Sequence, residues 1–340
     1  MLFRRICGID LGTDTIKICD KHEKLIVCEK NMIAIRNKVN VIAIGKRAFE
    51  IYEKAPACVE VGSPMIHGAI ADSKNLEIVL TGLLKRFSTF FCKHPDLLVT
   101  APSEISEVEK RAFYELMSRK IKAKRIHLVA KGIADAIGIG MPVMVSMGNM
   151  VVNIGAATTE ISVISEGKVI IGRIIKTGGQ ALDGDIATMV RRQYNLNIGN
   201  KTAESLKNHL AYIQQGPERE LKVFGIHTVS GIPHSVQIPS LPVSVSIIET
   251  IDIIVDTIKT TLERTPPQLI EDIRKNGIYL AGGVSILPNL ADYIQKELGI
   301  QVYNVNTPAM NTLRGLTRIM NDKELRKLTY PLKDYIGKVI

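Results

Sequence analysis

Short hydrophobic runs flank a glycine-containing polar turn at two places in the sequence. In ICGIDLGTDTIKICD, residues 6–10 and 15–19 are rich in β-forming side chains and predict two strands that bend at Gly12. The segment MVVNIGAATTEISVIS, at 150–165, repeats this pattern with its bend at Gly155. A duplicated β-hairpin, one copy in each half of the chain, indicates two related lobes that face each other across a cleft.

A hairpin turn of this kind can bind phosphate. Successive backbone N–H groups and a small hydroxyl group can surround phosphate oxygens where glycine leaves the approach open. When the two copies are aligned, Asp10 at the end of the first strand corresponds to Asn153. The carboxylate of Asp10 could hold hydrated Mg²⁺ beside the phosphates, whereas the amide of Asn153 contributes no charge.

A third segment, NGIYLAGGVSILPNLADYIQKELGI, predicts a strand at 278–281, a Gly282-Gly283 turn and a helix at 287–298 that ends at Gly299. A diglycine between a buried strand and a helix lets a flat base or a phosphate lie against the backbone. A tight strand-to-helix turn without a ligand is the alternative.

Two further helices are predicted from their ends. Ser106 and Glu109 have the spacing of a capping box, which predicts a helix that runs to about Arg119. Residues 244–264 predict another helix, which Pro266-Pro267 stops.

The composition is that of a globular protein with an excess of positive charge. Of 340 residues, 46% are hydrophobic and 23% charged, and no long apolar run lacks charge, so we expect no membrane-spanning segment. Five cysteines without CxxC spacing favour a reduced cytosolic protein with neither disulfides nor a zinc site. The net charge of +10 favours an acidic partner, although a solvated basic surface explains it equally. With seven Phe, nine Tyr, no Trp and no basic run interleaved with aromatics, we expect no nucleic-acid partner.

The three glycine-containing segments, in this order, resemble the actin/Hsp70/sugar-kinase ATPase superfamily, and nearly the whole chain is similar to the bacterial actin MreB family. GIDLGT at 8–13 and NIGAATTE at 153–160 look like its two phosphate motifs, and HGAIAD at 67–72 is similar to a further segment. The resemblance implies an α/β, actin-like two-lobed ATPase fold. Each lobe would have a mixed five-stranded sheet flanked by helices, plus a smaller subdomain, with nucleotide in the cleft.

The resemblance also implies boundaries for the two lobes. The first lobe would cover 1–146, with a small subdomain at about 33–65, and residues 307–340 would pack back on this lobe. The second lobe would cover 147–306, with a small subdomain at about 181–243. The extra sugar-binding elements of a kinase are not found, so a sugar kinase is the least expected function.

The resemblance also implies individual residues of a nucleotide site. ATP or ADP would contact Gly12, Thr13, Asp14, Gly155, Ala156, Ala157, Glu204, Lys207, Gly282 and Gly283, and Mg²⁺ would be held by Asp10 and, weakly, by Asn153. An exposed helical pair is the other interpretation of Glu204 and Lys207. Lys17 lies where actin has a phosphate-contacting lysine, or it is a surface residue of a strand.

The sequence departs from the family at positions that carry the chemistry. Where MreB proteins typically read EEPMAAAIGAG, this chain reads AKGIADAIGIG at 130–140, so Lys131 stands at the position of the water-activating acid. A charged lysine cannot readily accept a proton, and loss of a general base typically costs about 10²–10⁴ in rate. Ala156-Ala157 and Val284 replace further family glycines. We therefore expect weak or lost ATP hydrolysis and assign no catalytic residue.

Nucleotide binding is a separate question. Lys131 could face the phosphates as a fixed cation, which would allow weak binding without metal. An ion pair between Lys131 and Asp10 in an empty cleft is an equal alternative. An active ATPase whose base is Glu160 or Asp183 remains a rival.

Two apolar pairs suggest contact with a membrane. Phe90-Phe91 lies between basic residues in KRFSTFFCKHPDLL at 85–98, and the resemblance places the membrane-entering loop of MreB there. Leu2-Phe3, next to Arg4-Arg5, would form a second small anchor. Closure of the local core is the other interpretation of Phe90-Phe91.

Taken with the resemblance, these features predict a cytoskeletal filament protein of cell shape. It would be cytoplasmic, peripheral on the inner face of the cell membrane, and bound to an anionic membrane surface. Its partners would be further copies of itself, a standard MreB paralogue and membrane-embedded cell-shape proteins. A pseudo-ATPase that regulates the paralogue, or a monomeric binding module, is the alternative.

Overall fold

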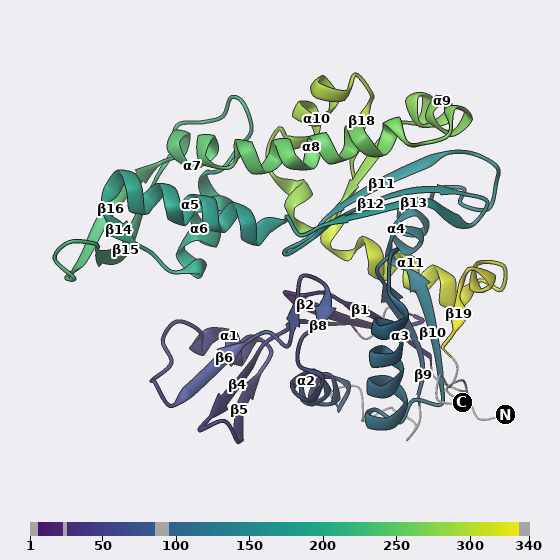
Figure 1. Ribbon diagram of the computed structural model, residues 1–340, viewed down its shortest axis with the longest axis horizontal. Coiled ribbons are helices and arrows are strands. Elements are labelled where there is room, and N and C mark those ends of the chain that lie inside the picture. Colours follow the sequence, from purple (N-terminus) through teal and green to yellow (C-terminus); the bar gives the residue numbers. More distant parts are fainter. Residues whose placement is uncertain (1–5, 23–25, 86–94, 333–340) are drawn as a thin grey trace. The chain divides into compact units, whose positions relative to one another are not determined.

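The computed structural model describes residues 6–22, 26–85 and 95–332, in which runs of strands are interspersed with helices (Figure 1). The strands up to residue 130 are β1 (Ile6–Leu11), β2 (Thr15–Asp20), β3 (Ile26–Lys30), β4 (Ile33–Arg36), β5 (Asn40–Ile44), β6 (Val59–Gly62), β7 (Met65–Ile66), β8 (Ala69–Ile70), β9 (Asp96–Ala101) and β10 (Arg125–Ala130). The helices up to residue 139 are α1 (Lys46–Ile51), α2 (Ser73–Lys85), α3 (Glu107–Tyr114), the π-helical turn η1 (Glu115–Lys120) and α4 (Lys131–Ile139).

The rest of the described chain also contains both strands and helices. Its strands are β11 (Asn149–Ile154), β12 (Thr159–Ser165), β13 (Lys168–Ile175), β14 (Leu196–Asn197), β15 (Glu220–His227), β16 (Pro233–Pro239), β17 (Ile278–Ala281), β18 (Val302–Asn304) and β19 (Tyr330–Pro331). Its helices are α5 (Gly179–Tyr194), α6 (Asn200–Leu210), α7 (Ser240–Ser246), α8 (Ile248–Glu263), α9 (Pro267–Asn276), α10 (Leu290–Leu298) and α11 (Asn311–Asn321), with short 3₁₀ turns η2 (Gly283–Ile286), η3 (Pro308–Met310) and η4 (Leu325–Leu328).

Two large sheets organise the described residues. The first has the order β19-β10-β9-β1-β2-β3, in which β1, β9 and β10 are parallel and the other pairings antiparallel. The second has the order β13-β12-β11-β17-β18. The prediction of a mixed α/β fold is confirmed. The first sheet has six strands rather than the expected five, because the two-residue strand β19 pairs with β10.

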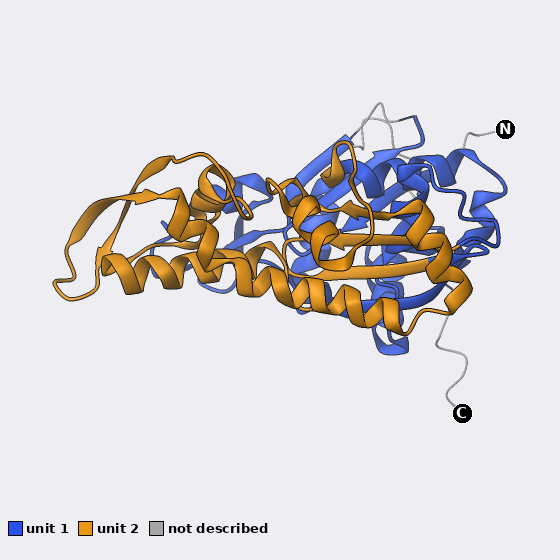
Figure 2. Cartoon of the chain, turned by 90° about the horizontal axis from the view of Figure 1, so that it is seen from above, with its two compact units in different colours: residues 1–147, 164–174, 310–340 blue, residues 148–163, 175–309 orange. Residues whose placement is uncertain are grey.

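The chain divides into two compact units, which Figure 2 shows in different colours. Unit 1 comprises residues 1–147, 164–174 and 310–340, and unit 2 comprises 148–163 and 175–309. Unit 1 also contains the small sheet β5-β4-β6, which packs with α1 over its own apolar cluster around Met32, Ala34, Ala48 and Val59. Unit 2 contains the small sheet β14-β15-β16.

Helices cover both faces of the first sheet. Side chains of β1 and β9 form one buried cluster with Leu76, Leu80 and Leu83 of α2 and with Phe113 and Met117 of α3 and η1. On the other face, α11 crosses β1 at Gly8, where an added Cβ would lie 3.0 Å from Leu316 Cβ. Burial of these side chains, at roughly 1.5–3 kcal/mol each, holds the end of β1 in a fixed position.

Helices α4 and α11 cross at very close range. A Cβ at Gly315 would lie only 1.8 Å from the backbone oxygen of Ala134, so no larger residue fits there. The fully buried Asp135 accepts a hydrogen bond of 2.7 Å from Thr312 Oγ1, which satisfies a polar group inside the crossing. The crossing therefore fixes α4, whose first residue is Lys131.

Helix ends show where the sequence predictions were correct and where they failed. The capping box at Ser106 and Glu109 is present, but α3 ends at Tyr114 and continues as the π-helical turn. The helix predicted over 244–264 is in fact two helices that meet at Ile247. The helix predicted at 287–298 begins only at Leu290. Leu287 precedes a proline and has ψ 126°, an extended conformation that a residue before proline prefers.

Candidate functional site

The first predicted hairpin forms as expected from β1 and β2. Its turn is closed by a hydrogen bond of 3.2 Å from the Gly12 N–H to the Thr15 carbonyl. A Cβ on Gly12 would lie 2.6 Å from that carbonyl oxygen, which explains the glycine. The backbone N–H groups of Thr13 and Asp14 donate no hydrogen bond to any residue that the structure describes. Unpaired amides in such a turn are suited to bind an anion.

Asp10, at the end of β1, lies between two lysine side chains. Lys17 Nζ is 3.2 Å from Asp10 Oδ2, and Lys131 Nζ is 4.0 Å from Asp10 Oδ1. Thr100 Oγ1 donates a hydrogen bond of 3.0 Å to the same carboxylate. Burial alone would raise the pKa of this carboxyl, but the positive charges of Lys131 and Lys17 outweigh burial and lower it. Asp10 is therefore an ionised carboxylate already neutralised by the protein.

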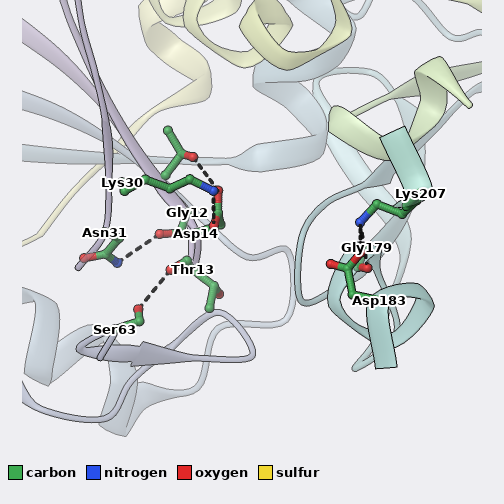
Figure 3. Close-up of polar contacts among 10 residues, drawn as sticks. Gly12, Thr13, Asp14, Lys30, Asn31, Ser63, Gly179, Asp183 and Lys207 are labelled. Carbon is green, nitrogen blue, oxygen red and sulfur yellow. Dashed lines mark hydrogen bonds and ion pairs between the residues drawn. The ribbon is translucent and has the colours of Figure 1, made fainter. Parts of the chain in front are cut away.

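The second acidic residue of the turn is also neutralised. Lys30 Nζ donates to both carboxylate oxygens of Asp14, at 2.9 and 3.0 Å (Figure 3). Asn31 Nδ2 donates to the Gly12 carbonyl at 3.0 Å, and Ser63 Oγ donates to the Thr13 carbonyl at 2.9 Å. Three ammonium groups, those of Lys17, Lys30 and Lys131, therefore lie beside the two carboxylates of this turn.

The second hairpin has the same geometry as the first. The Gly155 N–H donates to the Thr158 carbonyl at 2.9 Å, as Gly12 does to Thr15. A Cβ on Gly155 would lie 3.0 Å from that oxygen. Asn153 is the penultimate residue of β11 and is buried, as Asp10 is at the same position of β1. The predicted duplication is therefore present in the backbone, although one copy lacks the carboxylate.

Helix α5 begins against the second turn. The Gly179 and Gln180 N–H groups donate to the carbonyls of Gly155 and Ala156, at 2.9 and 2.7 Å. The backbone N–H of Ala156 donates to no described residue, and Ala157 is buried. The two alanines therefore lie within a turn whose carbonyls are held by α5.

Lys207 contacts the start of the same helix. Its Nζ lies 2.7 Å from Asp183 Oδ1 and donates at 2.9 Å to the Gly179 carbonyl (Figure 3). Both side chains of this pair are only 12% exposed. Lys207 is thus not the exposed helical residue of the alternative interpretation, while Glu204, one turn earlier on α6, is half-buried.

The diglycine is placed beside the second hairpin. Gly282 has φ +87°, and a Cβ there would lie 2.3 Å from the Ile154 carbonyl oxygen. Nothing lies within 4 Å of the corresponding position at Gly283. Val284 Cγ2 would lie 3.1 Å from a Cβ at Gly179. Within unit 2, the structure therefore brings together Asn153, Gly155, Ala156, Gly179, Lys207 and Gly282.

By themselves, the side chains at the first turn do not fit a tightly held magnesium ion. Mg²⁺ requires a near-octahedral set of oxygen ligands, usually including carboxylates. At the first turn, Asp10 supplies one carboxylate that already contacts two ammonium groups. Within 6–22, 26–85 and 95–332, no three His, Cys, Asp or Glu side chains form a group that could hold a metal. The unpaired turn amides, in contrast, fit phosphate.

Three residues at the first turn were not predicted as site residues from the sequence: Lys17, Lys30 and Thr100. Lys17, treated as a possible surface residue, is 15% exposed and paired with Asp10. The strand register could have revealed it, because Asp10 and Lys17 lie directly opposite each other across the hairpin. Lys30 lies opposite Thr15 on the next strand. Thr100 gave no signal, because it reaches Asp10 only through the parallel pairing of β9 with β1.

The predicted membrane residues Leu2, Phe3, Phe90 and Phe91 lie outside the described residues. In the part of the chain that the structure describes, no helix has the length and apolarity needed to cross a bilayer.

The mixed α/β sheets and the duplicated phosphate-type hairpin are those of an actin-like protein. The family model of the MreB/Mbl protein matches residues 4–328, and the chain belongs to this family. It is 33% identical to the cell shape-determining protein Mbl of Bacillus subtilis over 311 residues, which cover 90% of this chain and 93% of Mbl. It is also 33% identical to the cell shape-determining protein MreB of Escherichia coli, with 92% of each chain covered.

Solved structures agree with this assignment. The crystal structure of MreB5 of Spiroplasma citri bound to AMPPNP superposes with a TM-score of 0.90 at 26% identity, covering 96% of this chain and 98% of that chain. The MamK double helical filament superposes with a TM-score of 0.77 at 18% identity, covering 94% and 99%. The actin-like fold expected from the sequence is confirmed.

Proposed function

We propose that this protein is a cytoskeletal protein of cell shape that associates with further copies of itself into filaments. The support is family membership over residues 4–328 and the relatives in Bacillus subtilis and Escherichia coli, which are named cell shape-determining proteins. A sedimentation assay of the purified chain, with and without nucleotide, tests this part. A protein that stays monomeric under all conditions would instead be a binding module that uses an actin-like fold.

We further propose that the two hairpins bind ATP or ADP. MreB5 of Spiroplasma citri was crystallised with AMPPNP and with ADP. The unpaired amides of Thr13, Asp14 and Ala156 are suited to phosphate oxygens. Gly282 packs its backbone against Ile154, and the exposed Gly283 beside it leaves backbone accessible to a base. Glu204 and Lys207 would complete the adenosine contacts.

Hydrolysis of the bound nucleotide would be weak or absent. The observation that carries this proposal is the position of Asp10 between Lys17 and Lys131, at 3.2 and 4.0 Å. Lys131 stands where the family resemblance expects the acid that activates water, and its ammonium group supplies positive charge instead of a base. Phosphate release from ATP, compared with a standard family member under the same conditions, tests the proposal directly.

A second candidate follows from the same observation. A subunit that binds but does not hydrolyse ATP would not switch states by itself, so it would act by joining filaments of a standard MreB paralogue. Co-sedimentation with such a paralogue, but not alone, would favour this regulatory function. Filaments that form from this chain alone would favour an independent, long-lived polymer.

The place of action we propose is the inner face of the cell membrane. Its support is the net charge of +10 and the apolar pairs Leu2-Phe3 and Phe90-Phe91 next to basic residues. Each pair is small, so binding would depend on many subunits acting together in a filament. Flotation with anionic vesicles, repeated with Phe90→Ser and Phe91→Ser, tests this location; unchanged flotation would contradict a role for that pair.

A further inference from the structure

A hollow of about 370 Å³ lies at the edge of the first sheet, within unit 1. Its walls come from the end of α3 and the π-helical turn η1, from the start of β10, and from the end of β19 with Leu332, which follows it. Figure 1 shows α3 beside β10 and β19. The polar side chains that line it include Tyr114, Ser118, Lys124, Arg125 and His127. Its volume is in the range of small-molecule sites, about 300–1,000 Å³.

This hollow is separate from the hairpin site. Arg125 is the first residue of β10 and pairs with Asp96, the first residue of the parallel strand β9. Asp10, in contrast, is near the carboxyl end of β1, which runs parallel to β9. The hollow is therefore at the opposite ends of the parallel strands from the nucleotide hairpin.

The surroundings of the hollow are strongly basic. The segment RKIKAKRIH, at 119–127, contains five Lys or Arg residues and one His and has no acidic residue. Lys120 is partly neutralised by Glu77, at 3.4 Å. Lys124 and Arg125 are exposed, and neither forms an ion pair with any carboxylate in the described part of the chain. These two side chains supply unneutralised charge at the rim.

His127 adds a titratable group to the wall. Its Nδ1 lies 3.1 Å from Thr329 Oγ1. Burial lowers its pKa, the Asp96 carboxylate opposes that change, and the positive charge of Arg125 adds to it. An anion in the hollow would favour the imidazolium form, since it would offset both burial and Arg125.

We propose that this hollow binds a phosphate group carried by a small molecule or a lipid headgroup. A guanidinium group can bind two phosphate oxygens at once, and the ammonium of Lys124 adds charge. The hydroxyl groups of Tyr114 and Ser118 can donate further hydrogen bonds. A π-helical turn is rare and is frequent at functional sites, and η1 supplies Ser118 to this one. The proposal does not depend on nucleotide binding.

The test uses the full chain and two probes, inorganic phosphate and glycerol 3-phosphate, titrated by calorimetry at low salt. The double variant Lys124→Ala, Arg125→Ala removes the rim charges. The matched control is Arg191→Ala, Arg192→Ala, which removes two exposed charges from α5. We expect binding by the wild type and the control, and at least a tenfold loss in the rim variant. The phosphate probes themselves take up a proton between pH 8 and pH 6, so His127→Gln is titrated at the same pH values. The ratio of wild-type to His127→Gln affinity should rise from pH 8 to pH 6.

Three results would overturn the proposal. They are no binding by the wild type, equal losses in the rim and control variants, or unchanged binding in the rim variant. The last result would place the phosphate elsewhere, for instance at the hairpins. Where the proposal holds, vesicles of phosphatidic acid and of phosphatidylcholine distinguish the two sources. Rim-dependent binding to phosphatidic acid vesicles alone indicates a headgroup, and glycerol 3-phosphate binding without vesicle binding indicates a free metabolite.

Discussion

The ammonium nitrogen of Lys17 lies 3.2 Å from the Asp10 carboxylate, directly across the first hairpin. The two residues occupy opposite positions on β1 and β2, so the register of the hairpin itself makes the contact. Lys131 adds a second ammonium group, 4.0 Å from the other carboxylate oxygen. Asp10, the carboxylate expected to bind a metal, is therefore already paired with two ammonium groups of the protein.

Metal-independent nucleotide binding is the first expected outcome. Because Lys17 and Lys131 can neutralise phosphate charge, ATP or ADP should raise the thermal stability in EDTA as well as in Mg²⁺. A ligand at a hundredfold excess over Kd stabilises the native state by about 2.7 kcal/mol. Thermal unfolding with each nucleotide measures the shift.

The control for this experiment is Lys131→Gln, which keeps a side chain of similar length without charge. It should reduce the shift in EDTA more than the shift in Mg²⁺. A wild-type shift that appears only with Mg²⁺ would mean that Asp10 binds the metal and that the lysines do not replace it. No shift in either condition would contradict nucleotide binding at the hairpins.

Replacement of the missing acids should restore some hydrolysis. The double variant Lys131→Glu, Asn153→Asp supplies a base and a second carboxylate for the metal. We expect faster phosphate release, by up to the range of about 10²–10⁴ that a general base typically contributes. Phosphate release over hours measures it. Lys131→Gln removes the cation without adding a base, and an equal gain in that variant would refute the role of Glu as the base.

The hairpins could be predicted from the sequence because their cause is local. Gly12 and Gly155 each precede by three residues the carbonyl that closes the turn, at Thr15 and Thr158. The backbone itself requires glycine at position 12 and leaves little room for a side chain at position 155, so the pattern is readable in a single sequence. The same holds for the capping box of α3.

Other features depend on packing between distant segments and left no local trace. Ile247 interrupts the helix predicted over 244–264, although that segment contains neither glycine nor proline. Thr100 reaches Asp10 across ninety residues of chain. The hollow at β10 combines two segments about 200 residues apart, Ser118 to His127 and Pro331-Leu332. Only the fold brings these groups together.

The stability of the protein should depend on the ionisation of Asp10. Its pKa in the folded chain is below the ordinary value of 3.8, so folding favours the charged form. Its contribution is therefore fully present above pH 3.8 and is lost as the pH falls through the lower, folded value. In Asp10→Asn, the free energy of unfolding should fall less steeply as the pH is lowered. Urea unfolding of both proteins between pH 6 and pH 2.5 measures the difference, and parallel curves would contradict the assignment.

Asp183 offers a test of the rival active ATPase. Its carboxylate lies 2.7 Å from Lys207 Nζ, an arrangement suited to structure and not to a free base. Asp183→Asn should leave any residual phosphate release unchanged but destabilise the protein by about 1–3 kcal/mol, since a nearly buried ammonium loses its partner. Glu160→Gln is the parallel variant for the other candidate base. A loss of phosphate release in either variant, with nucleotide binding retained, would support the rival.

The glycine of the first turn should be intolerant of even one methyl group. A Cβ at Gly12 would lie 2.6 Å from the Thr15 carbonyl oxygen, which belongs to the backbone and cannot rotate away. Gly12→Ala should therefore destabilise the protein by about 1–3 kcal/mol and weaken nucleotide binding. Gly184, inside α5, has nothing within 4 Å of its Cβ position, so Gly184→Ala is the matched control. Because alanine favours a helix over glycine, it should stabilise the protein by about 0.5–1 kcal/mol. Urea unfolding of both variants measures the change in the free energy of unfolding. Equal changes would mean that the first turn moves freely and that its glycine is not there for steric reasons.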